Sequence, residues 1–581
     1  MRLLKLLKNM LQSLYNSVKR FPVTISLSTL TTVLVIMAIE AAKIKTGNLS
    51  EVYIRLGMAT ALGIPISLLF KFVFERVEKL SLGAKVSSYI LGGVFLVLYY
   101  LFWLPDFEML AITRYLGVTM ALYLLALAAP YCYHRANFEI YITRLITRFI
   151  ITLVFAGVLQ MGLYAILTTL NRLLGVAIYP NLYLYIWITI LGVFAPVHFL
   201  GGVPSSNLDR RDFPEVLKVL LVYIIMPLLA IYTSILYIYF AKIIITLQWP
   251  VGLVGHLVLW YAVISTITIF LVTPLEKENK WVKTFVFWFT KVVLPLLVMM
   301  FFSLGKRIEA YGVTENRYYV LILGLWVLGT MLYWNFSRRR KNIILPLSLA
   351  ILALISVCGP FSAYAISIRS QTNRFYNIVT KYDMLRDEKL KTPKTEISDP
   401  DKKEINEIIK YFQSNHTLKD LKYLPEDFGV AQMPELFGFE YQRYGRIGGR
   451  QHFFYVAQNP TGPLGIKDYD YLFGFYTFNK PKILSDDEII AEYDTERKEL
   501  KIEYQGELIY QINLRDYLNK IYENHRSSLT SQTLENKEME IINENDRAKI
   551  KILFTHINGY TDSKNEIEFT SEEFYLLFML K

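Results

Sequence analysis

Long apolar stretches separated by short polar connections fill the chain up to about Arg369. An α-helix needs about 20 mostly apolar residues to cross the roughly 30 Å hydrocarbon layer of a bilayer. This spacing predicts a membrane α-helical bundle of about 11 transmembrane helices within a polytopic domain over 21–369. The predicted spans are 21–42, 52–74, 86–104, 112–133, 146–170, 181–200, 216–242, 253–273, 284–304, 317–336 and 342–366.

The pattern after Arg369 is that of a water-soluble chain. Residues 370–400 are polar and charged, which predicts a helix followed by a linker. Residues 401–581 predict a soluble α+β domain, a sheet with helices on one face. Its expected helices are 401–414 and 515–525. Its expected strands are 450–456, 469–478, 500–504, 508–513, 549–556 and 565–570, with a hairpin at Gln505-Gly506, a turn at 558–563 and a mobile loop at 526–547.

Charge changes at the same boundary. Residues 1–369 hold 33 Lys and Arg against 14 Asp and Glu, whereas residues 370–581 hold 29 against 36. The basic excess lies beside apolar spans, where the positive-inside rule explains it, so nucleic acid is not an expected partner. The bilayer is the first expected partner.

The connections between spans predict the orientation. The set 1–20, 71–85, 134–148, 201–218, 274–283 and 337–341 holds 22 Lys and Arg residues, whereas the alternate set holds 8. The first set, and with it the N-terminus, is therefore expected in the cytoplasm. Eleven spans then place the C-terminal domain outside. Residues 1–20 form a basic amphipathic N-terminal segment, suited either to the anionic cytoplasmic surface or to a plain orientation signal.

Catalytic signatures are missing from the sequence. It contains no phosphate-binding P-loop, no H-E-x-x-H zinc motif and no G-x-S-x-G elbow. The only two cysteines, Cys132 and Cys358, fall inside predicted spans, so the soluble domain has no disulfide or cysteine nucleophile. We therefore assign no catalytic residue, cofactor or metal ligand, and we favour a protein that is not an enzyme.

Ionisable residues inside spans are candidate functional residues, because they are costly in lipid unless they face a cavity or a partner. Lys291, His198, His256 and Glu40 are the four candidates. The alternative is structural: each side chain reaches an interface or makes one interhelical hydrogen bond. For His198, His256 and Glu40 the structural alternative is favoured, and for Lys291 the two are balanced.

The expected outward connection at 306–318 is unusually polar. Its candidate residues are Arg307, Glu309, Tyr311, Glu315 and Arg317. They could clamp the two adjacent spans together or dock the soluble domain, and the clamp is the favoured interpretation.

Three motifs carry a resemblance to a known family. They are Tyr311-Gly312-Val313-Thr314-Glu315-Asn316-Arg317-Tyr318, the cluster Arg338–Lys341, and Gly359-Pro360-Phe361-Ser362-Ala363-Tyr364. With the plan of many spans and a polar tail, they resemble the bacterial family of the domain of unknown function 4153, most clearly over about 140–370. The resemblance implies an uncharacterised multi-pass protein of the bacterial plasma membrane, and it brings no catalytic residues.

Three functions remain open. The favoured one is a non-enzymatic envelope protein whose extracytoplasmic domain binds a cell-envelope polymer, a peptide or another membrane protein. Dense aromatic residues, as in Tyr469–Tyr476, could form such a binding platform, although sheet packing explains them more simply. The alternative is a transporter or channel-like permease for a small solute or ion. A weaker alternative is an integral-membrane transferase for lipid-linked substrates, with Asp106 and Glu108 as its outward carboxylates.

Overall fold

The chain folds into two compact units, Met1–Arg374 and Phe375–Lys581. The computed structural model describes residues 12, 14–43, 47–77, 80–104, 109–131, 137–204, 213–246, 253–337, 340–386, 389–425, 427–441, 451–458, 464–476, 482–485, 488–525, 531–561 and 566–581. The first twenty residues therefore lie mostly outside the described part. Each unit is a separate structural body with its own core.

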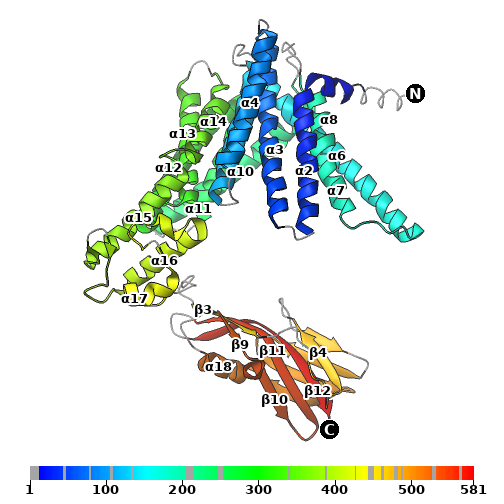
Figure 1. The fold of residues 1–581 in the computed structure, drawn as a ribbon, viewed down its shortest axis with the longest axis vertical. Helices are drawn as coiled ribbons and strands as arrows, with labels where there is room; N and C mark the ends of the chain where they lie inside the picture. Colours follow the sequence, from blue (N-terminus) through cyan, green and yellow to red (C-terminus); the bar gives the residue numbers. More distant parts are fainter. Residues whose placement is uncertain are drawn as a thin grey trace. The chain divides into compact units, whose positions relative to one another are not determined.

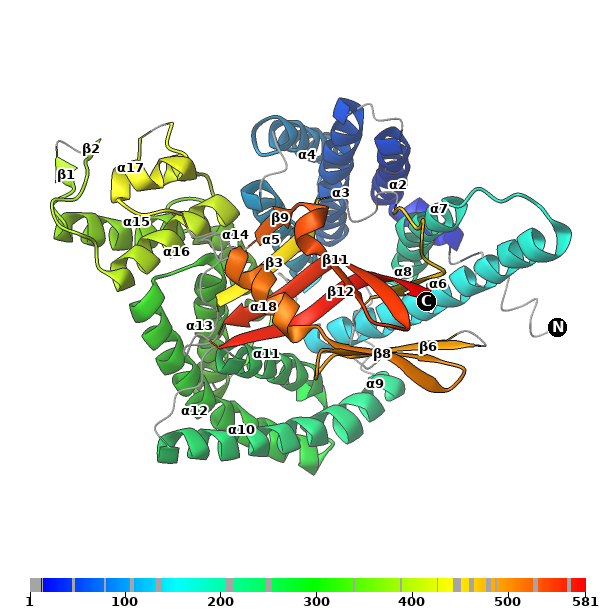
Figure 2. The same ribbon diagram turned by 90° about the horizontal axis from the view of Figure 1, so that it is seen from below.

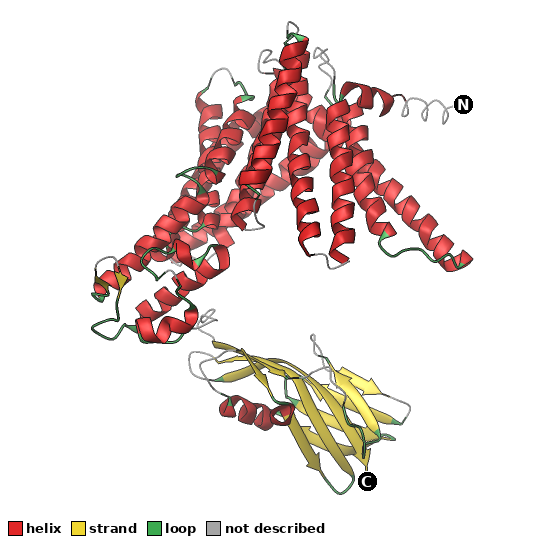
Figure 3. Cartoon of the chain, viewed as in Figure 1, coloured by secondary structure: helices red, strands yellow, loops and turns green. Residues whose placement is uncertain are grey.

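Every regular element described in the first unit is a helix (Figures 1 and 3). In that part, ten helices or continuous helical runs are long and apolar enough to cross a membrane. The chain is thus a multi-pass membrane protein. The ten are α2 (Pro22–Lys43), α3 (Gly47–Arg76), α4 (Leu82–Phe102), α5 (Met109–Ala128) extended by η1 (Ala129–Tyr131), α6 (Phe138–Leu174), α7 (Leu182–Thr189) with η2 (Ile190–Phe194) and α8 (Ala195–Gly201), α9 (Glu215–Val219) with η3 (Leu220–Ile225) and α10 (Met226–Thr246), α11 (Leu253–Val272) with η4 (Thr273–Leu275), α12 (Lys280–Tyr311) and α13 (Glu315–Phe336).

The eleventh predicted span, 342–366, differs from the other ten. It holds α14 (Ile344–Val357), which has only 14 residues, and the first residues of α15 (Ala363–Lys381). Gly359, whose φ is +78°, and Pro360 lie between the two helices, because a left-handed residue followed by proline cannot continue a helix. The expected single helix is therefore two helices.

Two spans contain a π-helical turn next to a proline. Pro196 has no N–H to donate to the carbonyl of Gly192, and the wider turn η2 ends directly before it, with Ala195 N–H bonded to the Ile190 carbonyl. The freed Gly192 carbonyl instead accepts a hydrogen bond of 2.5 Å from the Ser28 hydroxyl of α2. The turn η3 stands in the same relation to Pro227.

The second unit begins within α15 and continues with short elements. They are β1 (Leu385–Arg386), β2 (Lys389–Leu390), α16 (Asp399–Asn415), η5 (Leu418–Asp420), η6 (Val430–Gln432) and α17 (Met433–Phe437). Asp401 on α16 accepts hydrogen bonds of 2.6 Å from Lys381, the last residue of α15, and from Tyr382 directly after it. These bonds, with that of Lys381 first, lower the pKa of Asp401 to about 2.

Two further sheets complete the unit, and their strand pairs are antiparallel except for β3 with β9 (Figure 2). The larger has the order β4-β12-β11-β3-β9, with β10 also paired to β11, and the smaller has the order β5-β6-β7-β8. Both sheets and α18 contribute to one apolar core. The elements are β3 (Gln451–Ala457), β4 (Tyr471–Phe475), β5 (Lys482–Ser485), β6 (Ile489–Asp494), β7 (Glu499–Tyr504), β8 (Glu507–Asn513), α18 (Arg515–Asn524), β9 (Ser531–Leu534), η7 (Asn536–Met539), β10 (Glu540–Glu544), β11 (Ala548–Thr561) and β12 (Ile567–Leu580).

A buried polar network joins the two sheets. Lys498, in the turn before β7, lies 2.6 Å from the carboxylate of Glu572 on β12 and also donates to the Phe569 carbonyl at 3.0 Å. The Tyr493 hydroxyl of β6 donates to the same carboxylate at 3.2 Å. Burial raises the pKa of Glu572, whereas the adjacent Lys498 ammonium opposes that shift. The network links the smaller sheet to the larger one through groups that water does not reach.

Two details of the predicted α+β domain were wrong. Residues 526–547, expected as a mobile loop, contain β9, η7 and β10, and their Met539 and Ile541 side chains are buried. The turn expected at 558–563 is strand up to Thr561, where β11 ends, and residues 562 and 563 lie outside the described residues. Gly559 sits inside that strand because a Cβ atom there would lie 2.4 Å from the Phe453 ring.

Candidate functional site

Side-chain contacts join several of the loops between spans at one end of the first unit. Arg20, directly before α2, pairs with Glu75 near the end of α3 at 2.8 Å and donates to the Val203 carbonyl after α8 at 2.7 Å. Phe138 and Ile343, from two further connections, lie in the same apolar cluster as Phe21 and Val203. We call this the Arg20 end.

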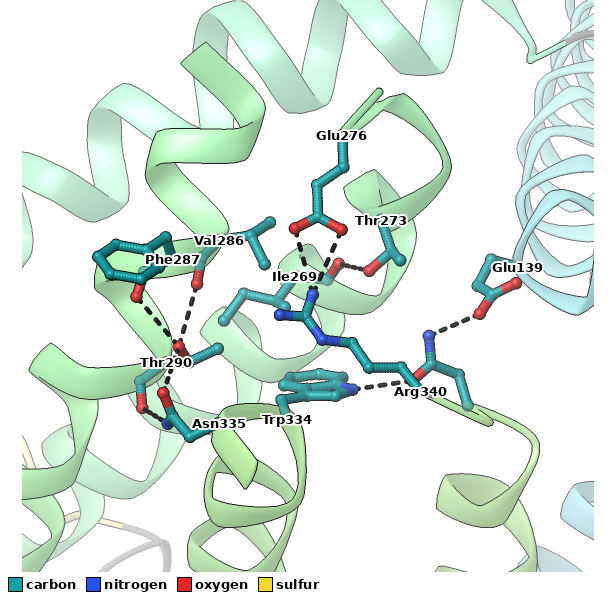
Figure 4. A network of polar contacts seen from close by, with 11 residues as sticks. Glu139, Ile269, Thr273, Glu276, Val286, Phe287, Thr290, Trp334, Asn335 and Arg340 are labelled. Carbon is teal, nitrogen blue, oxygen red and sulfur yellow. Dashed lines mark hydrogen bonds and ion pairs between the residues drawn. The ribbon is translucent and has the colours of Figure 1, made fainter. Parts of the chain in front are cut away.

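A network of polar contacts belongs to this end as well (Figure 4). Arg340 reaches Glu276 at 3.2 Å. Asn342 accepts from the Trp334 indole at 2.8 Å and donates to Glu139 at 2.6 Å. The connections gathered here are those of the set with 22 Lys and Arg residues. The alternation expected from the sequence therefore exists in the fold.

The opposite end holds connections of the alternate set. Lys43 at the end of α2 pairs with Glu40 at 2.9 Å and donates to the hydroxyls of Tyr179 at 2.5 Å and Tyr185 at 3.2 Å. Glu40, one of the intramembrane candidates, thus lies in an exposed cluster at a helix end. These contacts tie α2 to the connection between α6 and α7.

The loop between α12 and α13 lies at this opposite end and is held by α15. Gln371, which is 2% exposed, donates to the carbonyls of Tyr311 and Val313, both at 3.0 Å. Ser370 accepts from the Val313 N–H at 2.9 Å. Arg340 lies at the Arg20 end, whereas Gln371 lies at the opposite end. Between these two residues the chain has therefore crossed the unit once more, over the length of α13.

Gly312 makes the tight form of that loop possible. Its φ is +67°, and a Cβ atom on it would lie 2.7 Å from Arg374 Cδ, so other residues would be strained. Arg317 donates to the carbonyl of Gly312 at 2.6 Å and to that of Tyr311 at 3.0 Å. We call these contacts on the α12–α13 loop the clamp, and the role of Tyr311 and Arg317 in joining the two adjacent spans, favoured from the sequence, stays a prediction.

A polar pocket of about 220 Å³ lies between α11, α12 and α13 beside the clamp. It brings together three candidates that the sequence names separately: His256, Arg307 and Arg317. Two other candidates lie elsewhere. Glu309 is exposed, and Glu315 lies within electrostatic reach of the Tyr319 and Tyr364 hydroxyls. The polar lining consists of His256, Ser303, Arg307, Thr314, Asn316 and Arg317.

A larger cavity of about 740 Å³ lies between α2, α3, α5, α6 and the run α7–α8. Its lining is mostly apolar, with hydroxyls that include those of Ser28 and Thr152. The Thr152 hydroxyl lies 2.8 Å from Nδ1 of His198, whose backbone carbonyl accepts from Arg148 at 2.7 Å. His198 is 5% exposed. It therefore makes an interhelical hydrogen bond next to this cavity.

Lys291, the fourth intramembrane candidate, is exposed on α12. Its ammonium lies 3.1 Å from the centroid of the Phe287 ring and 5.9 Å from that of Trp288. It lines neither cavity. A functional role for any of the four intramembrane candidates stays a prediction.

Sequence reasoning missed the residues that complete these sites. Gln371 lies at the start of the stretch expected to be a polar helix followed by a linker, and only its place after the Gly359–Tyr364 motif could have indicated a role near the membrane. Asp106 and Glu108, named for a transferase, lie outside the described residues. The remaining described residues contain no group of three or more His, Cys, Asp or Glu arranged to hold a metal ion.

Comparisons with known proteins agree with the plan of the chain. The profile of the domain of unknown function DUF4153 matches residues 26–388, which is more than half of the chain. The uncharacterized protein PM1469 of Pasteurella multocida is 24% identical over 278 residues, which cover 47% of this chain and 47% of that protein. The chain thus spans about half the length of the curated relative it matches. No solved structure matches.

Proposed function

The chain belongs to the DUF4153 family, and from its own geometry we propose that it is a non-enzymatic envelope protein. Its helical unit anchors the protein in the bacterial plasma membrane with the N-terminus in the cytoplasm. Its C-terminal unit is extracytoplasmic and binds a partner there, either a cell-envelope polymer, a peptide or another membrane protein.

The return of the chain to the α12–α13 loop is the observation that carries this proposal. The first span starts at the Arg20 end, where the basic loops lie, and an even number of spans returns the chain to that end. The segment formed by α14 and the start of α15 instead brings Gln371 to the opposite end, where it binds the Tyr311 and Val313 carbonyls. Positive charge is retained in the cytoplasm, so the end opposite Arg20 faces outward.

Exposed apolar groups on the β-sheet support a binding role for the C-terminal unit. The β4 strand is an edge of the larger sheet, and its Leu472 is 49% exposed. Tyr476, directly after β4, is 48% exposed and donates to the Tyr575 hydroxyl at 3.0 Å. An unpaired edge with exposed apolar side chains is a surface to which an extended partner can add. The rest of the aromatic run is more protected, since Phe475 is fully buried.

Cysteine labelling tests the orientation. In a chain with Cys132 and Cys358 replaced by Ala, Glu523→Cys places one exposed thiol on α18, and Lys19→Cys places one at the Arg20 end. We expect a membrane-impermeant maleimide to label Glu523→Cys in intact spheroplasts and Lys19→Cys only after permeabilisation. The reverse pattern would overturn the proposed orientation.

Truncation tests the function itself. A chain that ends at Arg374 keeps the helical unit and the clamp on the α12–α13 loop. We expect it to insert into the membrane and to fail to restore a deletion phenotype that the full chain restores. Full restoration by the inserted truncated chain would refute the proposal.

A permease is the second candidate, and the 740 Å³ cavity favours it. The cavity is lined by hydroxyls and lies beside the π-helical turn η2, and such turns are frequent at functional sites. In reconstituted vesicles under a potassium diffusion potential, a pH-sensitive dye would report proton flux. The permease would be favoured if the wild type and Lys291→Met carried proton flux and His198→Phe did not. Equal flux in the wild type and both variants would count against it.

A further inference from the structure

We propose that the polar pocket between α11, α12 and α13 binds a phosphate group, either as the free ion or on the headgroup of a membrane lipid. This binding site goes beyond the proposed envelope role, and it does not depend on which side of the membrane the pocket faces. The residues that would bind the anion are Arg307 on α12, His256 on α11, and Asn316 with Thr314 at the start of α13.

The charge of the pocket calls for an anion. Arg307 and Arg317 both line it, and none of its lining residues carries a carboxylate. Arg317 donates to two backbone carbonyls, which are neutral groups. A guanidinium cannot lose its proton in a protein, so two such groups in one pocket repel each other unless an anion joins them.

Arg307 is the side chain that is free to bind the anion. Within the described part of the chain, its guanidinium makes no hydrogen bond or ion pair, although the side chain is half-buried. The adjacent Lys306 differs, because it is exposed and its ammonium lies 5.5 Å from the centroid of the Phe302 ring. A half-buried guanidinium without a partner has given up part of its hydration, and an oxyanion restores that loss through two parallel hydrogen bonds.

The other donors suit a tetrahedral group more than a flat one. Thr314 is the N-cap of α13 but its side chain makes no capping hydrogen bond, so its hydroxyl remains available. Ser303 and Asn316 add donors from α12 and α13. Donors that converge from three helices match the oxygens of a phosphate, which point in four directions, better than the two coplanar oxygens of a carboxylate. The pocket volume of about 220 Å³ admits that group.

Binding by the full-length protein tests the proposal directly. In a neutral detergent, we would measure thermal unfolding and calorimetric binding with inorganic phosphate, against chloride at equal ionic strength. A second arm would compare nanodiscs of phosphatidylglycerol with nanodiscs of phosphatidylcholine and would detect retained lipid by native mass spectrometry. We expect stabilisation by phosphate in the first arm, by phosphatidylglycerol in the second, or by both, and the arm that responds identifies the source of the phosphate group.

Two neighbouring substitutions give a matched pair. Arg307→Gln should weaken binding about tenfold or more, because a charge-assisted contact is lost. Lys306→Gln removes the same charge one residue away and should change binding less than about twofold. Ser303→Leu, which fills the pocket and keeps both guanidinium groups, should also prevent binding and replaces Arg307→Gln if that variant fails to fold. Equal binding by the wild type and the pocket variants in both arms, or an equal loss in Lys306→Gln, would overturn the proposal.

Discussion

Lys498→Met should strongly destabilise the C-terminal unit. The substitution removes an ammonium that lies 2.6 Å from Glu572 and leaves a fully buried carboxylate without that positive charge, although the Tyr493 hydroxyl still donates to it. The Coulomb attraction lost at that distance is about 6 kcal/mol at an effective dielectric constant of about 20. Loss of one partner from a buried pair costs about 3–5 kcal/mol of unfolding free energy overall. Methionine keeps the apolar length of lysine and has a Cβ atom, so the left-handed backbone at this residue, with φ of 57°, is equally strained in both proteins.

The pH dependence of the variant has a definite sign. Burial already raises the pKa of Glu572 in the wild type, and the loss of Lys498 removes a group that lowers it. The folded variant therefore binds a proton at pH values where the unfolded chain does not, so its stability falls as the pH rises through and above the ordinary Glu value. Lowering the pH from about 8 to about 5 should recover part of the loss, because Glu572 can then fold in its neutral form.

Hydrogen–deuterium exchange of β12 peptides in the full-length protein measures these effects. A loss of about 3–5 kcal/mol should accelerate exchange about a hundred-fold to several thousand-fold at neutral pH. Lys501→Met is the control, because its pair with Glu499 is partly exposed and contributes about 0–1 kcal/mol. The double variant Lys498→Met with Glu572→Leu should regain most of the stability. Similar exchange in Lys498→Met and Lys501→Met, or a variant that becomes less stable as the pH falls from 8 to 5, would refute this account of the network.

Three further predictions concern single contacts. Gly192→Ala should lower the melting temperature of the protein in detergent, because the new Cβ would lie 2.0 Å from Thr32 Oγ1 and force α2 away from η2; an unchanged melting temperature would contradict this packing. Acid should loosen the contact between α15 and α16 as the pH falls from about 4 to about 2. The pKa of Asp401 in the folded protein is about 2, so its ionised carboxylate stabilises the contact fully above the ordinary Asp pKa and loses this effect as the pH falls toward 2. Asp401→Asn should abolish that acid step in hydrogen exchange. Gln371→Ala should speed exchange of the α12–α13 loop, because the Val313 carbonyl loses its Gln371 donor and the Tyr311 carbonyl loses one of several, at a cost of about 1–3 kcal/mol; protection equal to that of the wild type would count against the clamp.

Periodic apolar patterns made most of the fold predictable. Each of the ten long helices overlaps one of the first ten spans expected from length alone, because a bilayer demands a minimum apolar length. The hairpin at Gln505-Gly506 was also predictable, since both residues adopt positive φ values of 50° and 82° that suit this pair in a tight turn. Strand β9 was not predictable, because Ser531–Leu534 has no alternation of its own and is a strand through its parallel pairing with β3.

The sequence indicated single candidate residues, but it did not indicate which of them lie together in the fold. The cost of ionisable side chains in lipid indicates His198 and His256, but no spacing rule places His256 beside Arg307, which is about fifty residues away in the sequence. That neighbourhood depends on how α11, α12 and α13 pack. Lys291 shows another limit, since its depth within the span left a functional and a structural role balanced, and only the packing of α12 places it on an exposed face.

The π-helical turns have a consequence for the family history of this fold. In a π-helical turn the hydrogen bond joins a carbonyl to the N–H five residues later, so the turn holds one residue more than an α-helical turn. The turns η2 and η3 therefore each correspond to a one-residue insertion within a span. In a plain α-helix, one extra residue would rotate everything after it by about 100° around the helix axis, since an α-helix has about 3.6 residues per turn, whereas the wider π-helical turn takes up that residue locally. Relatives that lack the extra residue before the position of Pro196 would therefore keep the same face of α8 toward the bundle, with the residue aligned to His198 still beside the one aligned to Thr152. A single-residue gap in an alignment at Ile190–Phe194 would thus leave the rest of the span in register and change the lining of the cavity only next to the gap.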